Sequence, residues 1–588
     1  MDGFIQLFSE YNVPAAFLVN IELTLWSALF SLILGVVLVM MRISPISSLR
    51  TVAGAYVELF KNLPLTIIMV FMVLGAYAQL KLTFSDTFVT NFFWLAVTGL
   101  SLYTAAFVCE SLRSGINTVP IGQAEAARAL GLGFMQSATQ IILPQAFRGS
   151  VAPLGNTLIA LLKNSTVAAA ASVATETSSL MSTMIEFHPD VIVQIFLIFA
   201  FGYVILIIPI GMPRTCPTSS PCGGDDMADT SNSVLFDQPG PKGRRTIRIV
   251  NWVAALIFVG VLVLILMRLH NPPDGENQLS WELWKPALER EAWTDFYLPG
   301  LWMTVKASIV AVVGSVVFGL VFGVGRLLPN VVLRAISSVV VEFCRAVPVL
   351  LLMIFFWRWF AFAGLSSPSY WAVVLALVLY NGSVVAELVR SGVGNLPNGQ
   401  REASLALGLT ETQSLMQIEV PQAVYAMLPA AVTQLVVVLK DTALGSIIMY
   451  TDLLQESRRL GSMYFNILQT LVVAAVVYFI VCWLLSRLAE WLPSRMQQRT
   501  AAPAEPEPVP PIAIMDPSNV NQIAVAKEVE ERPLRGTPLT YHVHHRGSNA
   551  SIHNWQRTRY EQGFDEAHPD PQGGDEDDAE QKNAEDDA

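Results

Sequence analysis

The chain has 588 residues, of which 53% are hydrophobic and only 14% are charged, a balance typical of membrane proteins. The net charge of −11 resides in residues 561–588, which hold 12 Asp and Glu against one Lys, while the remainder has 35 acidic and 35 basic residues. The sequence therefore excludes a basic surface for nucleic acid, and its five Cys show no spacing for a disulfide framework or a metal site.

The N-terminal residues 1–15 include Asp2 and Glu10 and lack the basic start of a signal peptide. Apolar runs long enough to span a bilayer follow. They lie at 16–41, 55–79, 91–112, 151–173 and 191–212 in the first half, and at 249–267, 300–325, 337–363, 370–390, 426–448 and 464–486 in the second. We therefore predict an all-α polytopic membrane protein with five plus six helices.

Four pairs of opposite charges stand three residues apart near the ends of these runs, a spacing that brings both members to one helix face. The pairs are Glu58 with Lys61, Glu110 with Arg113, Glu342 with Arg345, and Glu387 with Arg390. Two interpretations stay open: structural ion pairs near the membrane interface, or direct substrate contacts. Pro64 and Pro348 follow two of the pairs at matching positions and are expected to kink their helices.

A hydrophilic stretch, GQAEAARALG at 122–131, comes after the third run and continues into ILPQA at 142–146. It recurs 277 residues later, without a gap, as GQREASLALG at 399–408, continuing into EVPQA at 419–423. Good helix formers fill both copies, and Gly131 and Gly408 stand where a helix would end in a left-handed turn. The small Ala residues leave a helix face that another protein can approach closely. A duplication of this size indicates two equivalent domains.

Glu-Ala-Ala, three residues, Gly, nine residues, Ile, one residue and Leu-Pro resembles the "EAA" signature of membrane permeases of ATP-binding-cassette (ABC) importers. The flanking Gly-Gln and Pro-Gln-Ala, and Glu110–Ile116, resemble the polar amino acid branch of that family. The likeness covers about 10–212 and 240–495, and the two halves look like a glutamate permease pair joined in one chain. It implies two type I ABC importer transmembrane domains. Ser404 and Val420 depart from the signature, but both stay small or apolar.

In that family the loop docks into a cleft of a cytoplasmic ATPase subunit, so the resemblance implies a coupling role for both stretches. The residues that it implicates are Gly122, Gln123, Glu125, Ala126, Ala127, Gly131, Gly399, Gln400, Glu402, Ala403, Ser404 and Gly408. The chain has no Gly-x4-Gly-Lys-Ser/Thr phosphate loop. We therefore expect no catalytic residue, metal or cofactor in this chain, with ATP and Mg bound by a partner ATPase dimer.

Lys and Arg placement predicts the orientation. Arg42 and Arg50 follow the first span, which puts the N-terminus outside and the first loop in the cytoplasm. The extra span at 249–267 restores the orientation of the second half, although Arg268 at its outer end opposes this. Both loops and the C-terminus then face the cytoplasm, unlike the matching loops of inverted repeats in secondary transporters.

Lys163-Asn164 and Lys440-Asp441 also match at the offset of 277 residues. Lys163 lies 12 residues into its span, about 18 Å at the helical rise and near mid-membrane. A lysine at that depth needs an anionic partner. An amino acid carboxylate is one candidate; Asp441 or a wet gap is the other, and the sequence leaves both open. These four residues are the candidate substrate path.

The expected domains are the extracytoplasmic N-terminus, two permease domains, a linker, an extra helix, an external segment and a tail. The N-terminus covers 1–15, the permease domains cover 16–212 and 300–495, and the linker covers 213–248. The extra helix covers 249–267, the external segment 268–299 and the tail 496–588. Trp281, Trp284 and Trp293 in the external segment fit either a solute-binding-protein contact or an aromatic belt. The acidic tail lacks apolar periodicity and is expected to be disordered.

The predicted function is import of an amino acid by a multi-pass permease of the bacterial plasma membrane. The expected partners are the ATPase dimer, an extracytoplasmic solute-binding protein, the amino acid and membrane lipid. Glutamate is the first candidate substrate; glutamine, aspartate and basic amino acids are the others. An ion-coupled secondary transporter and a scaffold without transport are the alternatives.

Overall fold

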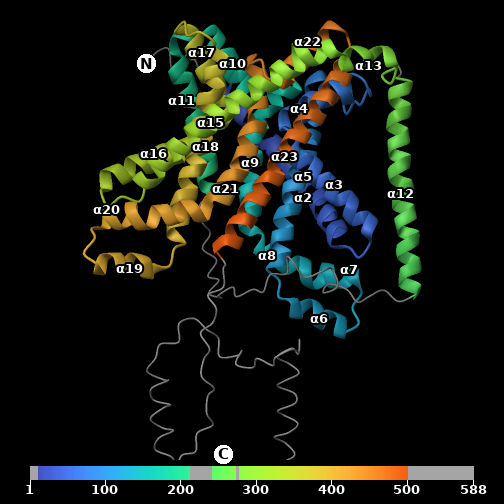
Figure 1. Ribbon diagram of the computed structural model, residues 1–588. Helices are drawn as coiled ribbons and strands as arrows, with labels where there is room; N and C mark the ends of the chain where they lie inside the picture. Colours follow the sequence, from blue (N-terminus) through green and yellow to red (C-terminus); the bar gives the residue numbers. More distant parts are fainter. Residues whose placement is uncertain (1–10, 212–240, 273–276, 501–588) are drawn as a thin grey trace, which may run out of the picture. The chain divides into compact units, whose positions relative to one another are not determined.

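The computed structural model describes residues 11–211, 241–272 and 277–500, which form helices and no strands. The all-α prediction is therefore confirmed. Most of the expected linker 213–248 and of the tail 496–588 lies outside the described residues. Figure 1 shows the helices as one bundle, with the short helices α6 and α19 at the same end of it.

Helices α2 to α11 make up the first half. They are α2 (Val13–Ile43), α3 (Ser47–Asn62), α4 (Leu65–Phe71), η1 (Met72–Tyr77), α5 (Phe88–Asn117), α6 (Ile121–Ala129), α7 (Phe134–Ser137), η2 (Ala138–Ile142), α8 (Leu143–Gly149), α9 (Val151–Asn164), η3 (Ser165–Ala171), α10 (Thr177–Phe187), η4 (Pro189–Val191) and α11 (Ile192–Gly211). The extra helix α12 (Pro241–His270) begins within the stretch expected to be linker.

The segment that joins α12 to the second half contains α13 (Trp281–Leu288), α14 (Arg290–Ala292) and η5 (Trp293–Tyr297). The second half then repeats the first. Its helices are α15 (Leu298–Gly325), α16 (Val331–Ala346), α17 (Val349–Phe362), α18 (Pro368–Gly394), α19 (Asn398–Ala406), α20 (Glu411–Ser414), η6 (Leu415–Glu419), α21 (Val420–Asp441), η7 (Thr442–Ile448), α22 (Leu453–Met463) and α23 (Ile467–Thr500).

Eight helices of the described residues are long and apolar enough to cross a membrane, and ten if each bent pair counts as one span. The bent pairs are α3 with α4 and η1, at 101°, and α16 with α17, at 98°. Proline restricts the preceding residue to extended backbone, and Leu63 (ψ 142°) and Val347 (ψ 129°) adopt it. The kinks predicted at Pro64 and Pro348 are confirmed.

One expected span takes another form. Residues 151–173 fold as α9, of 14 residues, followed by the 3-10 turn η3. The element is shorter than the other spans because its helix changes to a 3-10 turn at Ser165, directly after the Lys163-Asn164 pair. The second half makes the same change at Thr442, directly after Lys440-Asp441.

Small residues allow the long helices of each half to pack closely. A Cβ added to Gly35 of α2 would overlap Val108 of α5, and a Cβ added to Gly319 of α15 would overlap Val385 of α18. The two halves also share one hydrophobic core, in which Phe196 of α11 stacks on Phe355 of α17 with ring centroids 4.2 Å apart. These contacts hold the broken helices and the helix ends around a common centre.

Helix α12 has no counterpart in the first half. Asn251 Oδ1 accepts from the backbone N of Ser48 at 3.3 Å, and the Arg268 Nε donates to the Leu80 carbonyl at 3.3 Å. None of the residues in the apolar stretch that could span the membrane is buried inside the protein. An apolar helix with this much exposed surface fits contact with lipid acyl chains.

Candidate functional site

Helices α6 and α19 carry the duplicated signature and are exposed on one face. The opposite face of α6 is buried and carries Ala124 and Ala127, of which Ala124 packs with Ala138 and Ile142. Glu125 lies on the other face with its side chain 61% exposed. The spacing of buried alanines three residues apart fixes this orientation. The remaining signature residues of this face, Gly122, Gln123, Ala126, Gly399, Gln400, Glu402 and Ala403, are exposed.

Gly131 and Gly408 end these helices in the left-handed conformation, with φ of +76° and +85°. The Leu132 N–H donates to the Ala127 carbonyl at 3.1 Å and the Gly131 N–H to Arg128 at 2.8 Å, which is a Schellman-type cap. The turn predicted from the sequence is confirmed. It projects the preceding Leu130 and Leu407 outward, 79% and 82% exposed. Sequence reasoning missed these leucines; their position before the glycine in both copies was the available signal.

Ser404 occupies the position of Ala127 and is buried to the same degree. Its hydroxyl bonds to the Arg401 carbonyl at 2.7 Å and to the hydroxyl of Ser414. Ser414 in turn donates to the buried carboxylate of Glu419 at 2.8 Å. The departure from the signature is therefore accommodated by a buried polar chain, where the first half has the apolar Ile142 in place of Glu419.

The two i,i+3 charge pairs of the second half form one ion-pair cluster. Arg345 lies 3.6 Å from Glu342 and 3.5 Å from Glu387, and Arg390 Nε donates to Glu387 at 3.1 Å. The i,i+3 pairs of this half are thus brought together. Arg326, from the end of α15, adds contacts of 3.0 Å to Glu342 and 2.9 Å to Glu387.

The first half pairs its charges differently. Glu110 bonds to Arg42 of α2 and lies 3.9 Å from Lys61, instead of pairing with Arg113. Glu58 and Arg113 make no ion pair within 4.0 Å among the described residues. Packing of α2 and α3 against α5 brings Arg42 and Lys61 to Glu110, which the spacing along one helix does not reveal.

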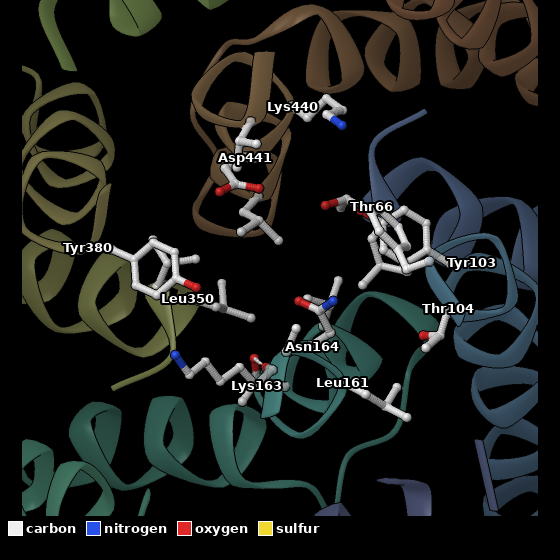
Figure 2. Close-up of a pocket in the computed structure, with 18 of the residues that line it drawn as sticks. Thr66, Tyr103, Thr104, Leu161, Lys163, Asn164, Leu350, Tyr380, Lys440 and Asp441 are labelled. Atoms are coloured by element: carbon white, nitrogen blue, oxygen red, sulfur yellow. Dashed lines mark hydrogen bonds between the residues drawn. The ribbon is translucent and has the colours of Figure 1, made fainter. Parts of the chain in front are cut away.

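The candidate substrate-path residues line a central pocket of about 330 Å³ between the two halves. Its lining includes Lys163 and Asn164 from the end of α9 and Lys440 and Asp441 from the end of α21 (Figure 2). Two equivalent tyrosines, Tyr103 of α5 and Tyr380 of α18, complete the wall. The structure therefore brings together all four residues that the sequence singled out, in a cavity large enough for a small ligand.

Both lysines bind backbone carbonyls of the opposite half. Lys440 Nζ donates to the carbonyl of Lys61 at 2.7 Å, and Lys163 Nζ donates to the carbonyl of Arg345. Lys61 and Arg345 hold equivalent places in the last turns of α3 and α16, just before the kinks. Carbonyls at a helix C-terminus lack intrahelical partners and carry partial negative charge, so they suit an ammonium group.

Asn164 and Asp441 hold equivalent places but differ in charge. Figure 2 shows both side chains pointing into the cavity. Neither lysine lies within 4.0 Å of the Asp441 carboxylate, and no hydrogen bond to that carboxylate occurs among the described residues. The pocket thus combines two ammonium groups and one carboxylate, for a formal charge of +1.

Each of the two relatives described next matches between a third and two fifths of this chain and most of its own length. The chain is 52% identical over 202 residues to the glutamate transport system permease protein GluC of Corynebacterium efficiens, covering 34% of this chain and 88% of that protein. It is 40% identical over 232 residues to the glutamate transport system permease protein GluD of Corynebacterium glutamicum, covering 39% and 84%. A crystal structure of an amino acid ABC transporter with histidines is 27% identical, covers 35% of this chain and 95% of that one, and has a TM-score of 0.33.

The family described as "binding-protein-dependent transport system inner membrane component" matches residues 23–212 and again residues 315–498. The matches contain both signature helices and both lysine pairs. They support the ABC class and not the ion-coupled alternative. The relatives of this chain named above are permease subunits rather than enzymes. The chain therefore belongs to the binding-protein-dependent transport system inner membrane components, as a multi-pass ABC permease in which two such domains are joined.

Proposed function

We propose that the chain carries both membrane domains of an ATP-driven importer for an acidic amino acid, with glutamate preferred. The glutamate permeases named above support the substrate class, and the charge of the central pocket carries the proposal. Glutamate and aspartate bear two carboxylates and one ammonium at neutral pH. The pocket offers the complementary set: the ammonium groups of Lys163 and Lys440 and the carboxylate of Asp441.

Each pocket group has a role in this proposal. Asp441 accepts the substrate's α-ammonium, and Asn164, on the other side, donates to or accepts from a polar group of the ligand. Lys163 and Lys440 receive the two carboxylates, at the expense of their bonds to the opposite half. Charge-assisted hydrogen bonds of this kind contribute about 1.5–3 kcal/mol each. Glutamine lacks one of these contacts and arginine reverses the net charge, so both should bind more weakly.

Energy for transport would come from partner subunits. In this proposal α6 and α19 face the cytoplasm and dock on an ATPase dimer, which binds ATP and Mg. Glu125 and Glu402 offer exposed carboxylates, and Leu130 and Leu407 offer exposed apolar tips for that contact. Movement of the two helices opens the pocket alternately to each side. A solute-binding protein delivers the amino acid at the other end, in a bacterial plasma membrane with the N-terminus outside and the C-terminus cytoplasmic.

Reconstitution tests the proposal. The full chain, its ATPase and its solute-binding protein are placed in liposomes, and uptake of labelled glutamate, aspartate, glutamine and arginine is measured with and without ATP. We expect ATP-dependent uptake of the acidic amino acids, insensitive to an ion gradient. Uptake driven by an ion gradient without the ATPase, or equal uptake of arginine, would reject the proposal.

A further inference from the structure

A second cavity, of about 690 Å³, adjoins the central pocket. The two cavities share the lining residues Phe107, Val437 and Lys440, so they meet at these three side chains. Its walls come from α2, α3 and α5 of the first half and from α21 and α23 of the second. It lies toward the C-terminal end of α5, which leads directly into the signature helix α6.

Basic side chains dominate this cavity, which we call the basic chamber. It is lined by the five cations Arg42, Lys61, Arg113, Lys440 and Arg487. Its carboxylates are Glu58 and Glu110 alone, which gives a formal charge of +3. Glu110 is already held by Arg42 and lies 3.9 Å from Lys61. The chamber therefore has more positive charge than its own carboxylates balance, at a size typical of small-ligand sites.

The internal duplication shows that the two halves pair their equivalent charges differently. Arg390 is the equivalent of Arg113, and it bonds to Glu387. Arg326 and Arg345 likewise contact Glu342 and Glu387 within 3.6 Å. Arg113, in contrast, makes no ion pair within 4.0 Å in the described part of the chain, and its side chain is exposed. Equivalent positions thus carry the same charges in both halves, but among the described residues only the arginine of the second half, Arg390, pairs with a carboxylate.

We propose that the basic chamber is a second binding site for the acidic amino acid, occupied after it leaves the central pocket toward α6. This proposal rests on the proposed function. Lys440 belongs to both cavities and can hold a carboxylate while the ligand passes between them. Arg113 supplies a planar guanidinium that binds a carboxylate through two parallel hydrogen bonds. In this proposal the ligand leaves between α3 of the first half and α23 of the second.

Equilibrium binding of labelled L-glutamate to the full chain in phosphatidylcholine nanodiscs tests the assignment. We expect two sites per chain in the wild type. Arg113→Gln should weaken the second site at least tenfold, and so should Lys61→Gln on α3, which covers the case in which the first variant folds poorly. The matched control is Arg390→Gln, the same change at the equivalent, ion-paired position, and it should keep both sites.

The outcomes separate this proposal from the proposed function. Absence of all glutamate binding and uptake would reject the function itself. One site in the wild type, with identical isotherms for Arg113→Gln and Arg390→Gln, would reject only the chamber. The measurement is repeated in phosphatidylglycerol nanodiscs: loss of the second site there would assign the chamber to an anionic lipid headgroup and overturn its assignment to the amino acid.

Discussion

Lys440 donates a hydrogen bond to the main-chain carbonyl of Lys61 at 2.7 Å, although 379 residues separate the two. Lys163 makes the equivalent bond to Arg345 in the opposite direction. Each half thus stabilises the end of the other half's broken helix from within the pocket. A ligand carboxylate that attracts either lysine competes with this bond, which links pocket occupancy to the position of α3 and α16.

Replacement of either lysine tests that link. Lys163→Gln and Lys440→Gln should each lower glutamate uptake at least tenfold, because each removes an ammonium that serves both the ligand and the opposite helix end. The measurement is uptake in reconstituted liposomes at equal membrane levels. Lys306→Gln serves as the control, since Lys306 lies over the Tyr370 ring, outside the pocket. Unchanged uptake affinity and rate in both pocket variants would contradict the role.

The charge difference between Asn164 and Asp441 predicts a swap experiment. Asp441→Asn should raise the KM for glutamate about 10- to 100-fold, because it removes the partner of the α-ammonium at a cost of about 1.5–3 kcal/mol. The double variant Asn164→Asp with Asp441→Asn restores the net charge on the other side of the pocket. It should recover part of the affinity; a KM no better than that of the single variant would mean that charge balance is not the determinant.

The left-handed turns after α6 and α19 predict a local effect on coupling. Gly131→Asp, and similarly Gly408→Ala, place a Cβ where φ is positive, which costs about 1–2 kcal/mol and displaces the neighbouring leucine. The variants should insert normally but lose ATPase association, measured by co-purification in detergent. Gly133→Ala is the control, because Gly133 has φ of −70° and an added Cβ would meet only the Gln136 side chain, at an ordinary 3.8 Å. Retention of the ATPase by Gly131→Asp would contradict docking at this turn.

Ser414 predicts a stability effect confined to the second half. Ser414→Ala leaves the buried Glu419 carboxylate without its hydrogen-bond donor and should cost about 1–3 kcal/mol. The double variant Ser404→Ala with Glu419→Ile reproduces the apolar pattern of Ala127 and Ile142 and should be close to wild type. Thermal unfolding in detergent measures both; equal loss in the two variants would show that the polar chain is not the cause.

Asp452 caps α22 between two spans and predicts a pH effect. Burial raises the pKa of its carboxyl to about 7, although the Gln455 N–H and the Tyr478 hydroxyl bond to it at 2.9 and 3.1 Å. A raised pKa in the folded state means that protonation favours folding. This stability is complete below pH 4 and is lost as the pH rises through 7. Asp452→Asn keeps the cap and should flatten the difference in melting temperature between pH 5 and pH 8.

The sequence predicted the elements that local chemistry controls. Proline placement gave the bends at Pro64 and Pro348, and glycine placement gave the turns at Gly131 and Gly408. It also singled out Lys163 and Lys440 by their depth in the spans. It did not identify their partners, because a backbone carbonyl at a helix end carries no signature in the residue type. The partner of Glu110 was likewise missed, since Arg42 reaches it from another helix.

The two halves are similar, yet only one of them contributes an aspartate to the pocket, and this restricts how the domains can assemble. A homodimer built from either half alone would place two aspartates in the cavity, or none. A single carboxylate between two ammonium groups arises only when unlike domains meet one to one. Fusion in one polypeptide guarantees that stoichiometry in every copy.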